Sequence, residues 1–117
     1  MIEASCHCGA VRIEIDEPPQ TVTDCNCSLC RRLGVLWAYY GVEQVRVTGP
    51  TIAYVQGERT IAAHHCSTCG CTTHWSGLAA ESARTAVNAR LMDPAVLARA
   101  RVRKLDGADT WKYLDEE

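Results

Sequence analysis

Eight cysteines fall into three short clusters along this chain of 117 residues. The clusters have the forms C-x-C, C-x-C-x-x-C and C-x-x-C-x-C, and their members are Cys6 and Cys8, then Cys25, Cys27 and Cys30, then Cys66, Cys69 and Cys71. Thiolates grouped in this way suit tetrahedral zinc, because a structural zinc commonly takes four thiolates from two short turns. The pattern therefore predicts two zinc ions per chain.

The outer clusters predict a structural zinc. Cys6 and Cys8 supply one pair of ligands, and Cys66 and Cys69 supply the other, roughly 60 residues later. A structural zinc contributes ~10 kcal/mol or more to folding, so this site would close most of the chain into one unit. Disulfides or free cysteines are the alternatives. A disulfide scaffold is set aside, because a C-x-C pair does not bridge internally without strain.

The middle cluster predicts a different kind of site. Cys25, Cys27 and Cys30 leave a fourth tetrahedral position for water, substrate or another residue, which is the arrangement that supports zinc catalysis. A thiol bound at such a position is deprotonated at neutral pH and becomes nucleophilic. In the alternative, Cys71 closes the site as an ordinary four-thiolate zinc. The weaker candidates for a fourth ligand are Asn26, His65 and His74.

The elements that carry these clusters are expected to be short strands. Residues 11–15 alternate apolar and polar side chains directly after the first cluster, which indicates a half-buried strand. Further strands are expected over 21–24, 35–41, 42–48, 52–56, 60–65, 72–75, 84–91 and 102–105, with helix as an alternative for 84–91. The expected turns are Gly49-Pro50, Gly57-Glu58 and Asp106-Gly107.

Two short helices are also expected. Ser28 and Gly34 bracket a single helical turn, and Asp93-Pro94 is a helix start that leads into residues 95–100. Gly9 and Gly70 follow their cysteine pairs, where tight turns need a conformationally free residue. Trp111 is expected to anchor the C-terminal tail. The sequence thus predicts a small, mainly antiparallel β fold with one or two short helices.

Length and charge bound the remaining possibilities. A chain of this length predicts one domain over residues 1–117. It contains no Phe, three Trp and four Tyr, so a metal would help a core with few large side chains. The net charge is −2 and falls to about −6 with eight thiolates around two Zn²⁺, which argues against a nucleic-acid partner. No run of ~20 apolar residues and no signal-peptide pattern occurs, so a cytoplasmic protein without a membrane partner is expected.

The three clusters together resemble a known family. The segments Cys6-His-Cys8-Gly9-Ala10-Val11, Cys25-Asn-Cys27-Ser-Leu-Cys30-Arg31-Arg32 and Cys66-Ser-Thr-Cys69-Gly70 are similar to the glutathione-dependent formaldehyde-activating enzyme (GFA) family, which also contains centromere protein V. The resemblance covers a core of about residues 4 to 105. His65 departs from it, because the position before the third cluster is often aromatic in the family.

The resemblance implies a fold, two metal sites and an activity. The implied fold is the zinc-stabilised β-tent, shared with methionine sulfoxide reductase B. Cys6, Cys8, Cys66 and Cys69 match the structural zinc, and Cys25, Cys27 and Cys30 match a second zinc associated with glutathione and formaldehyde. The implied activity is that of an S-(hydroxymethyl)glutathione synthase, a carbon–sulfur lyase in its reverse sense. The partners would be glutathione or another small thiol and formaldehyde or a related aldehyde.

Candidates for the substrate contacts follow from that implied chemistry. The carboxylates of a thiol such as glutathione need cations, for which the candidates are Arg31, Arg32, Arg59 and Arg90. Trp37, Tyr39, Tyr40 and Trp75 are expected either to line a pocket or to pack in the core. A zinc-binding structural or interaction module without catalysis is the alternative function.

Overall fold

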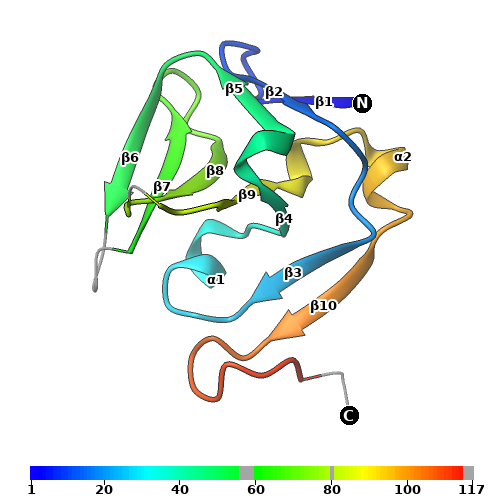
Figure 1. Ribbon diagram of the computed structural model, residues 1–117, viewed down its shortest axis with the longest axis vertical. Coiled ribbons are helices and arrows are strands. Elements are labelled where there is room, and N and C mark those ends of the chain that lie inside the picture. The colour runs from blue at the N-terminus through cyan, green and yellow to red at the C-terminus, as the bar shows by residue number, and fades with distance from the viewer. Residues whose placement is uncertain (56–59, 80, 115–117) are drawn as a thin grey trace.

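The computed structural model describes residues 1–55, 60–79 and 81–114, and within them the chain forms two β-sheets (Figure 1). The smaller sheet has the order β1 (Ile2–Ser5), β2 (Arg12–Ile15), β5 (Val45–Thr48). The larger sheet has the order β10 (Arg101–Leu105), β3 (Thr21–Cys25), β4 (Trp37–Gly41), β9 (Arg84–Asn88), β8 (Thr72–Gly77), β7 (Ile61–Cys66), β6 (Thr51–Val55). Neighbouring strands are antiparallel except β3 and β10, which are parallel. The prediction of a mainly β fold is confirmed.

The two expected short helices are also confirmed. They are α1 (Cys30–Leu33) and α2 (Pro94–Leu97), and the 3₁₀ turns η1 (Val42–Gln44) and η2 (Ala89–Leu91) accompany them. Gly34 ends α1 with a left-handed φ of 69°. The carboxylate of Asp93 caps α2 by accepting a hydrogen bond from the Ala95 N–H at 2.8 Å.

Several expected boundaries differ from those observed, for local physical reasons. The expected strand over 42–48 begins as η1, because the side-chain oxygen of Gln44 accepts a hydrogen bond from the Gly41 N–H at 2.9 Å. The strand over 84–91 ends at Asn88, whose side-chain oxygen accepts from the Arg90 N–H at 3.2 Å and caps η2. Strand β1 was not predicted, since Glu and Ala, two of its four residues, are uncommon in strands. The Gly57-Glu58 turn lies outside the described residues.

The main core is built from small aliphatic side chains. Ile13 and Ile15 of β2, Ala38 of β4, Val87 of β9 and Ala89 of η2 are each 0% exposed and belong to one buried cluster. Buried residues alternate with less buried ones along β2, whereas β4 and β9 are buried on both faces, with Trp37 and Ala86 in a second cluster. The cluster joins β2 of the smaller sheet to β4 and β9 of the larger sheet, and Val96 and Leu97 of α2 pack against it. The main core is therefore largely aliphatic, with Tyr40 as a buried aromatic member.

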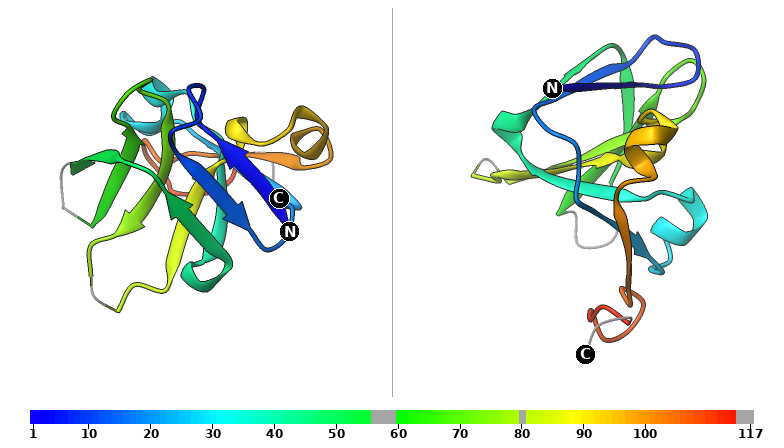
Figure 2. Two further views of the ribbon diagram at one scale, coloured as in Figure 1. Left: turned by 90° about the horizontal axis from the view of Figure 1, so that it is seen from above. Right: turned by 90° about the vertical axis from the view of Figure 1, so that its right-hand side faces the viewer.

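The segment after β10 coils beyond the tips of β3 and β10 (Figure 1; Figure 2, right). The expectation that Trp111 anchors it is wrong, because Trp111 is 68% exposed. Tyr113 holds the segment instead: its hydroxyl lies 3.0 Å from Oγ1 of Thr23, and its backbone forms a bridge with Leu105. No helix within the described ranges has the length and apolar character that a membrane crossing requires.

Candidate metal centres and an aromatic cavity

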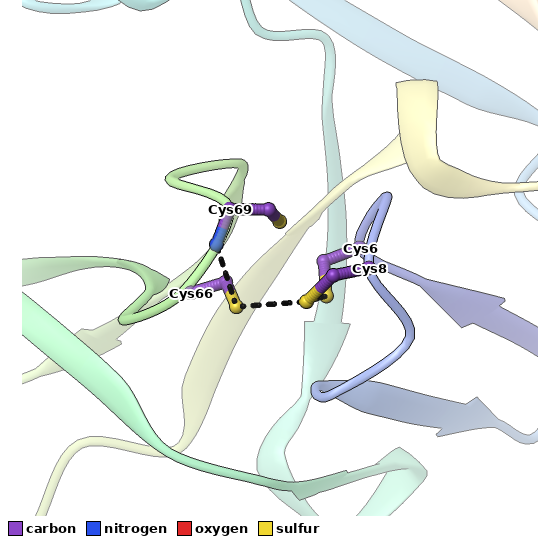
Figure 3. Close-up of side chains that lie close together, drawn as sticks. All are labelled: Cys6, Cys8, Cys66 and Cys69. Atoms are coloured by element: carbon purple, nitrogen blue, oxygen red, sulfur yellow. Dashed lines mark hydrogen bonds between the residues drawn. The ribbon is translucent and has the colours of Figure 1, made fainter.

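Four cysteines from two distant turns converge at one point (Figure 3). Cys6 and Cys8 lie in the loop between β1 and β2, and Cys66 and Cys69 lie in the turn between β7 and β8. All four sulfurs lie within 4.8 Å of one another, and Sγ of Cys8 is 3.6 Å from Sγ of both Cys6 and Cys66. Tetrahedral zinc with Zn–S bonds of ~2.3 Å needs sulfurs about 3.8 Å apart. The donor set fits a four-thiolate zinc, and we call it the four-cysteine group.

The two turns that supply these ligands share one backbone geometry. Gly9 and Gly70 both have φ of 81°, in the left-handed region. Their N–H groups donate to the carbonyls of Cys6 and Cys66 at 3.1 and 3.0 Å. The Val11 N–H also donates to Sγ of Cys6 at 3.3 Å. In the second turn the Thr68 N–H donates to Sγ of Cys66 at 3.4 Å. Backbone donors to sulfur favour the charged form of a thiol, which is the form that binds a metal cation.

Cys71 lies beside the four-cysteine group. Its side chain packs against the buried cluster of Cys6, Val11 and Cys66, and its carbonyl accepts a hydrogen bond from the Cys66 N–H at 2.9 Å. A hydrogen bond from the Cys71 backbone is the main cause that lowers the pKa of Cys69 to about 5. The structure thus places Cys71 next to the first site, and Cys71 does not join the middle cluster.

Cys25, Cys27 and Cys30 form a second group, which we call the three-cysteine group. Cys25 ends β3, Cys27 lies in the following loop, and Cys30 begins α1. Their sulfurs lie within 4.8 Å of one another, and across the described residues no fourth Cys, His, Asp or Glu joins them. The Cys30 N–H donates to Sγ of Cys27 at 3.3 Å, and the indole N–H of Trp37 donates to Sγ of Cys30 at 3.3 Å. Three preformed thiol donors fit one zinc ion.

The three thiols of this group differ in acidity. Burial raises the pKa of Cys25, and burial likewise raises the pKa of Cys30 to about 12. Burial also opposes ionisation of Cys27, but hydrogen bonds from the Cys30 N–H and from the neighbouring thiols outweigh it and lower the pKa of Cys27. Cys27 is therefore the thiol of this group that ionises most readily.

The weaker candidates for a fourth ligand are engaged elsewhere. The ring of His74 stacks on that of His64 with centroids 4.2 Å apart, and its Nδ1 lies 2.9 Å from Oγ1 of Thr73. The amide of Asn26 donates to the Asp106 carboxylate at 3.1 Å and accepts from the Ala108 N–H at 2.9 Å. His65 lies on β7, opposite Ile52 of β6. None of the three belongs to the three-cysteine group.

The three-cysteine group opens onto a cavity of about 460 Å³, which we call the cysteine cavity. Its walls come from the loop before α1, from α1 itself, from five strands (β3, β4, β7, β8 and β10) and from the C-terminal segment. Besides the three cysteines they comprise Leu29, Trp37, Tyr39, Thr60, Ile61, Trp75, Leu105 and Trp111. A larger hollow of about 720 Å³ lies elsewhere, near Glu17, Gln20 and Arg99, and contains no cysteine. The cysteine cavity is the candidate functional site, because the three thiols that could hold a metal ion line it.

The C-terminal segment is fitted closely to the three-cysteine group. The side-chain hydrogen bond from Asn26 to Asp106 joins the cysteine loop after β3 to the segment after β10. The Asn26 N–H also donates to the Leu105 carbonyl at 3.1 Å. Gly107 is buried, and a Cβ at this position would lie 2.5 Å from Sγ of Cys25 and 3.2 Å from Cβ of Cys27. The sequence indicated only a turn at Asp106-Gly107, since nothing local shows that it packs on a metal site.

The arginines expected to bind a substrate anion do not line the cysteine cavity. Arg31 and Arg32 are exposed on α1, where Arg32 donates to the Ser28 carbonyl at 2.7 Å. Nε of Arg90 donates to the Gly34 carbonyl at 2.8 Å. Arg59 lies outside the described residues.

The expected aromatic residues divide between cavity and core. Trp37, Tyr39 and Trp75 line the cysteine cavity. Tyr40 packs in the core and donates its hydroxyl to the Glu17 carbonyl at 3.0 Å. Trp111 was not expected to contribute, because it is distant in sequence from every cysteine cluster.

A family model described as glutathione-dependent formaldehyde-activating enzyme matches residues 1–105. The chain belongs to this family. The GFA match contains all eight cysteines and confirms the resemblance inferred from their spacing. It ends at Leu105, so the segment that carries Gly107 and Trp111 lies beyond it.

Two individual proteins extend the comparison of this GFA family member. A curated protein of Halomonas elongata, named "Putative glutathione-dependent formaldehyde-activating enzyme", is 48% identical over 33 residues, or 27% of this chain. The aligned part spans about a fifth (21%) of that relative's length. A crystal structure of a Rhodobacter sphaeroides protein superimposes with a TM-score of 0.70 at 30% identity, covering 86% of this chain and 99% of that one.

Proposed function

We propose that the chain is a zinc-dependent enzyme of the carbon–sulfur lyase class. Its substrate would be an adduct of glutathione or another small thiol with formaldehyde or a related aldehyde, and it would bind two zinc ions. The observation that carries the proposal is the contrast between the two cysteine groups. One has four sulfurs and is complete, whereas the other has three and opens onto a cavity.

The four-cysteine group has a structural role in this proposal. It joins the β1–β2 loop to the β7–β8 turn, and its donors are arranged as a closed tetrahedral site requires. The three-cysteine group offers three ligands and leaves a coordination position toward the cavity. Zinc held there would supply a positive charge that favours the thiolate form of a thiol and polarises a carbonyl oxygen.

The chain's own residues would hold and shield the reacting groups. Trp37 fixes the position of Cys30 through its indole N–H, and the Cys30 N–H fixes Cys27. The mainly apolar walls would lower the local dielectric once a substrate fills the cavity, which strengthens electrostatic interactions there. In the synthetic direction the substrate sulfur bonds to the aldehyde carbon and the C=O π pair moves to oxygen. The proton lost from sulfur ends on that oxygen, and the lyase direction is the reverse.

The remaining partners follow from charge and cysteine usage. Arg31 and Arg32, adjacent to Cys30 on α1, and Arg90 are candidates to bind glutathione carboxylates outside the cavity. A nucleic-acid partner is disfavoured by the negative charge of the zinc-loaded chain. The free, clustered cysteines support a cytoplasmic location, where thiols stay reduced.

Zinc content and thiol-dependent aldehyde consumption, measured on the same samples, test the proposal. We expect two zinc ions and a rate above the uncatalysed reaction for the wild type. We expect loss of the second zinc and of the rate for Cys27→Ser. Cys71→Ser is the matched control, because it removes a thiol outside both cysteine groups, and it should keep both properties. A wild-type rate no higher than the uncatalysed rate would instead favour a non-catalytic zinc-binding module.

A further inference from the structure

All three tryptophans of the chain line the cysteine cavity, although they lie far apart in the sequence. Trp37 is 3% exposed, belongs to β4 and contacts Cys30 directly through its indole N–H. Trp75, on β8, meets the ring of Tyr39 edge-on with centroids 6.3 Å apart and planes at 60°. Aromatic side chains therefore line the cavity both beside Cys30 and at the Tyr39–Trp75 pair.

Trp111 extends this lining at the C-terminal segment. Its side chain is 68% exposed yet lines the cavity. Its backbone is held, because the Trp111 N–H donates to the Asp106 carbonyl at 2.7 Å and Asp106 is tied to Asn26 of the cysteine loop. The exposed Trp111 ring borders the cavity, where it can bury apolar area against a ligand while its indole N–H stays free to donate.

The cavity has little to offer a charged group. Apart from the three cysteines, the polar side-chain groups among its described lining residues are the hydroxyls of Thr60 and Tyr39 and the indole N–H groups of Trp37, Trp75 and Trp111, and none of these lining residues is an acid, a base or a histidine. Burial raises the pKa of Tyr39 to about 12, so its phenol stays neutral. A carboxylate or ammonium group placed here would lose hydration without gaining an ion pair from the described lining residues. An uncharged ring would instead bury apolar surface on both sides.

We propose that the preferred substrate of the cysteine cavity carries an uncharged aromatic group next to its reacting sulfur or carbonyl carbon. This inference rests on the proposed thiol–aldehyde activity and specifies its substrate class. The ring contacts the side chains of Trp75 and Trp111, while the reacting atoms face the three cysteines, one of which is held by the buried Trp37. The bond changes are those of hemithioacetal formation: an S–C bond forms, the C=O π bond breaks, and the thiol proton moves to oxygen. Trp37 and Trp75 lie within the family match, and Trp111 lies beyond it.

Turnover of four substrate pairs tests the preference. The zinc-loaded full chain is assayed with glutathione and formaldehyde, benzyl mercaptan and formaldehyde, glutathione and benzaldehyde, and 2-mercaptoethanol and formaldehyde, each corrected for the uncatalysed rate. We expect kcat/KM to be about tenfold higher for at least one ring-bearing pair than for both ring-free pairs. The preferred pair shows whether the thiol or the aldehyde supplies the ring. A higher kcat/KM for glutathione and formaldehyde than for both ring-bearing pairs would overturn the inference and leave the proposed function standing.

Binding is measured independently of turnover, since every tryptophan of the chain reports on this cavity. Benzyl mercaptan should change the tryptophan emission and bind about tenfold more tightly than 2-mercaptoethanol, which brings the same sulfur without a ring. If no pair turns over, the proposed function fails and this comparison alone decides the inference. Equal affinity of the two thiols would then overturn it.

Two exposed side chains of the C-terminal segment give a matched pair of variants. Trp111→Ala should reduce the ring preference several-fold and leave zinc content at two. Leu114→Ala removes an apolar side chain that is 62% exposed and does not line the cavity, so it should leave the preference unchanged. The same preference in wild type and Trp111→Ala would show that the ring does not bind where we place it.

Discussion

The indole N–H of Trp37 donates a hydrogen bond to Sγ of Cys30 across 3.3 Å. It joins a buried residue of β4 to the first residue of α1, so a core strand fixes one member of the three-cysteine group. Burial raises the pKa of Cys30, and this hydrogen bond acts in the opposite direction. Trp37 therefore links the core, the aromatic wall and the candidate zinc site.

Replacing Trp37 by Phe tests that link, because it keeps a ring and removes the donor. A hydrogen bond to a charged acceptor is worth ~1.5–3 kcal/mol. We therefore expect Trp37→Phe to bind zinc roughly tenfold or more weakly at the three-cysteine group, with the other site unchanged. Competition with a chromophoric chelator measures both affinities. Trp75→Phe alters the same wall and is the control; equal weakening in both variants would contradict a specific role for the Trp37 N–H.

Gly107→Ala tests the close packing of the C-terminal segment on the cysteines. The new Cβ would lie 2.5 Å from Sγ of Cys25, so either the loop or the cysteine must move. Overpacking of this kind costs about 1–3 kcal/mol, and we expect a lower melting temperature and loss of zinc from the three-cysteine group. Ala108→Ser adds one atom at the next, exposed position and should have little effect. A Gly107→Ala protein that keeps both zinc ions and its melting temperature would show that the segment is loosely placed.

Gly70→Ala isolates the cost of a left-handed backbone. No atom lies within 4 Å of the Cβ that would be added, so the φ of 81° is the sole source of strain. We expect a loss of ~1–2 kcal/mol in the free energy of unfolding of the zinc-loaded protein, measured with denaturant. Asn tolerates this region better than Ala, so Gly70→Asn should lose less. Equal stability of Gly70→Ala and the wild type would contradict the shared geometry of the two turns.

His74 predicts a pH dependence of stability. The side chain is 9% exposed, and burial, with a smaller contribution from His64, lowers its pKa from 6.5 to about 4. Between these two values the unfolded chain binds a proton that the folded chain does not. The contribution of neutral His74 to the free energy of unfolding is therefore fully present above pH ~6.5. It decreases as the pH falls toward ~4, by at most roughly 3 kcal/mol.

His74→Gln provides the comparison for that pH dependence. It removes the titrating ring and can still pair with the Thr73 hydroxyl. Loss of zinc at acid pH affects both proteins, so the informative quantity is the difference between their unfolding free energies across this range. We expect the wild type to lose more stability than the variant between pH 6.5 and 4. Parallel pH profiles would contradict the prediction.

The sequence was most informative where function depends on local spacing. Cys6 and Cys8, and likewise Cys25, Cys27 and Cys30, are held by single turns, so their spacing alone indicated two metal groups. The left-handed glycines Gly9 and Gly70 were predictable for the same reason. That residues 1–117 form one domain, and that zinc occupies both groups, stay predictions.

The cavity could not be predicted, because it is assembled from segments that meet only in the fold. Trp37, Trp75 and Trp111 come from β4, β8 and the C-terminal segment, and nothing in their sequence spacing shows that they line the same cavity. Cys71 was ambiguous for a related reason. It lies two residues after Cys69, and only the path of the β7–β8 turn decides which cysteine group it approaches.

Zinc K-edge X-ray absorption of the two-zinc protein, before and after addition of a thiol substrate, tests the central claim most directly. Four sulfurs at one group and three at the other predict an average of about 3.5 sulfur ligands per zinc, rising to about 4 when the thiol binds. Cys27→Ser should keep one zinc with four sulfurs and show no response to thiol. An average of four sulfurs per zinc in the thiol-free wild type, unchanged on addition of thiol, would contradict the account.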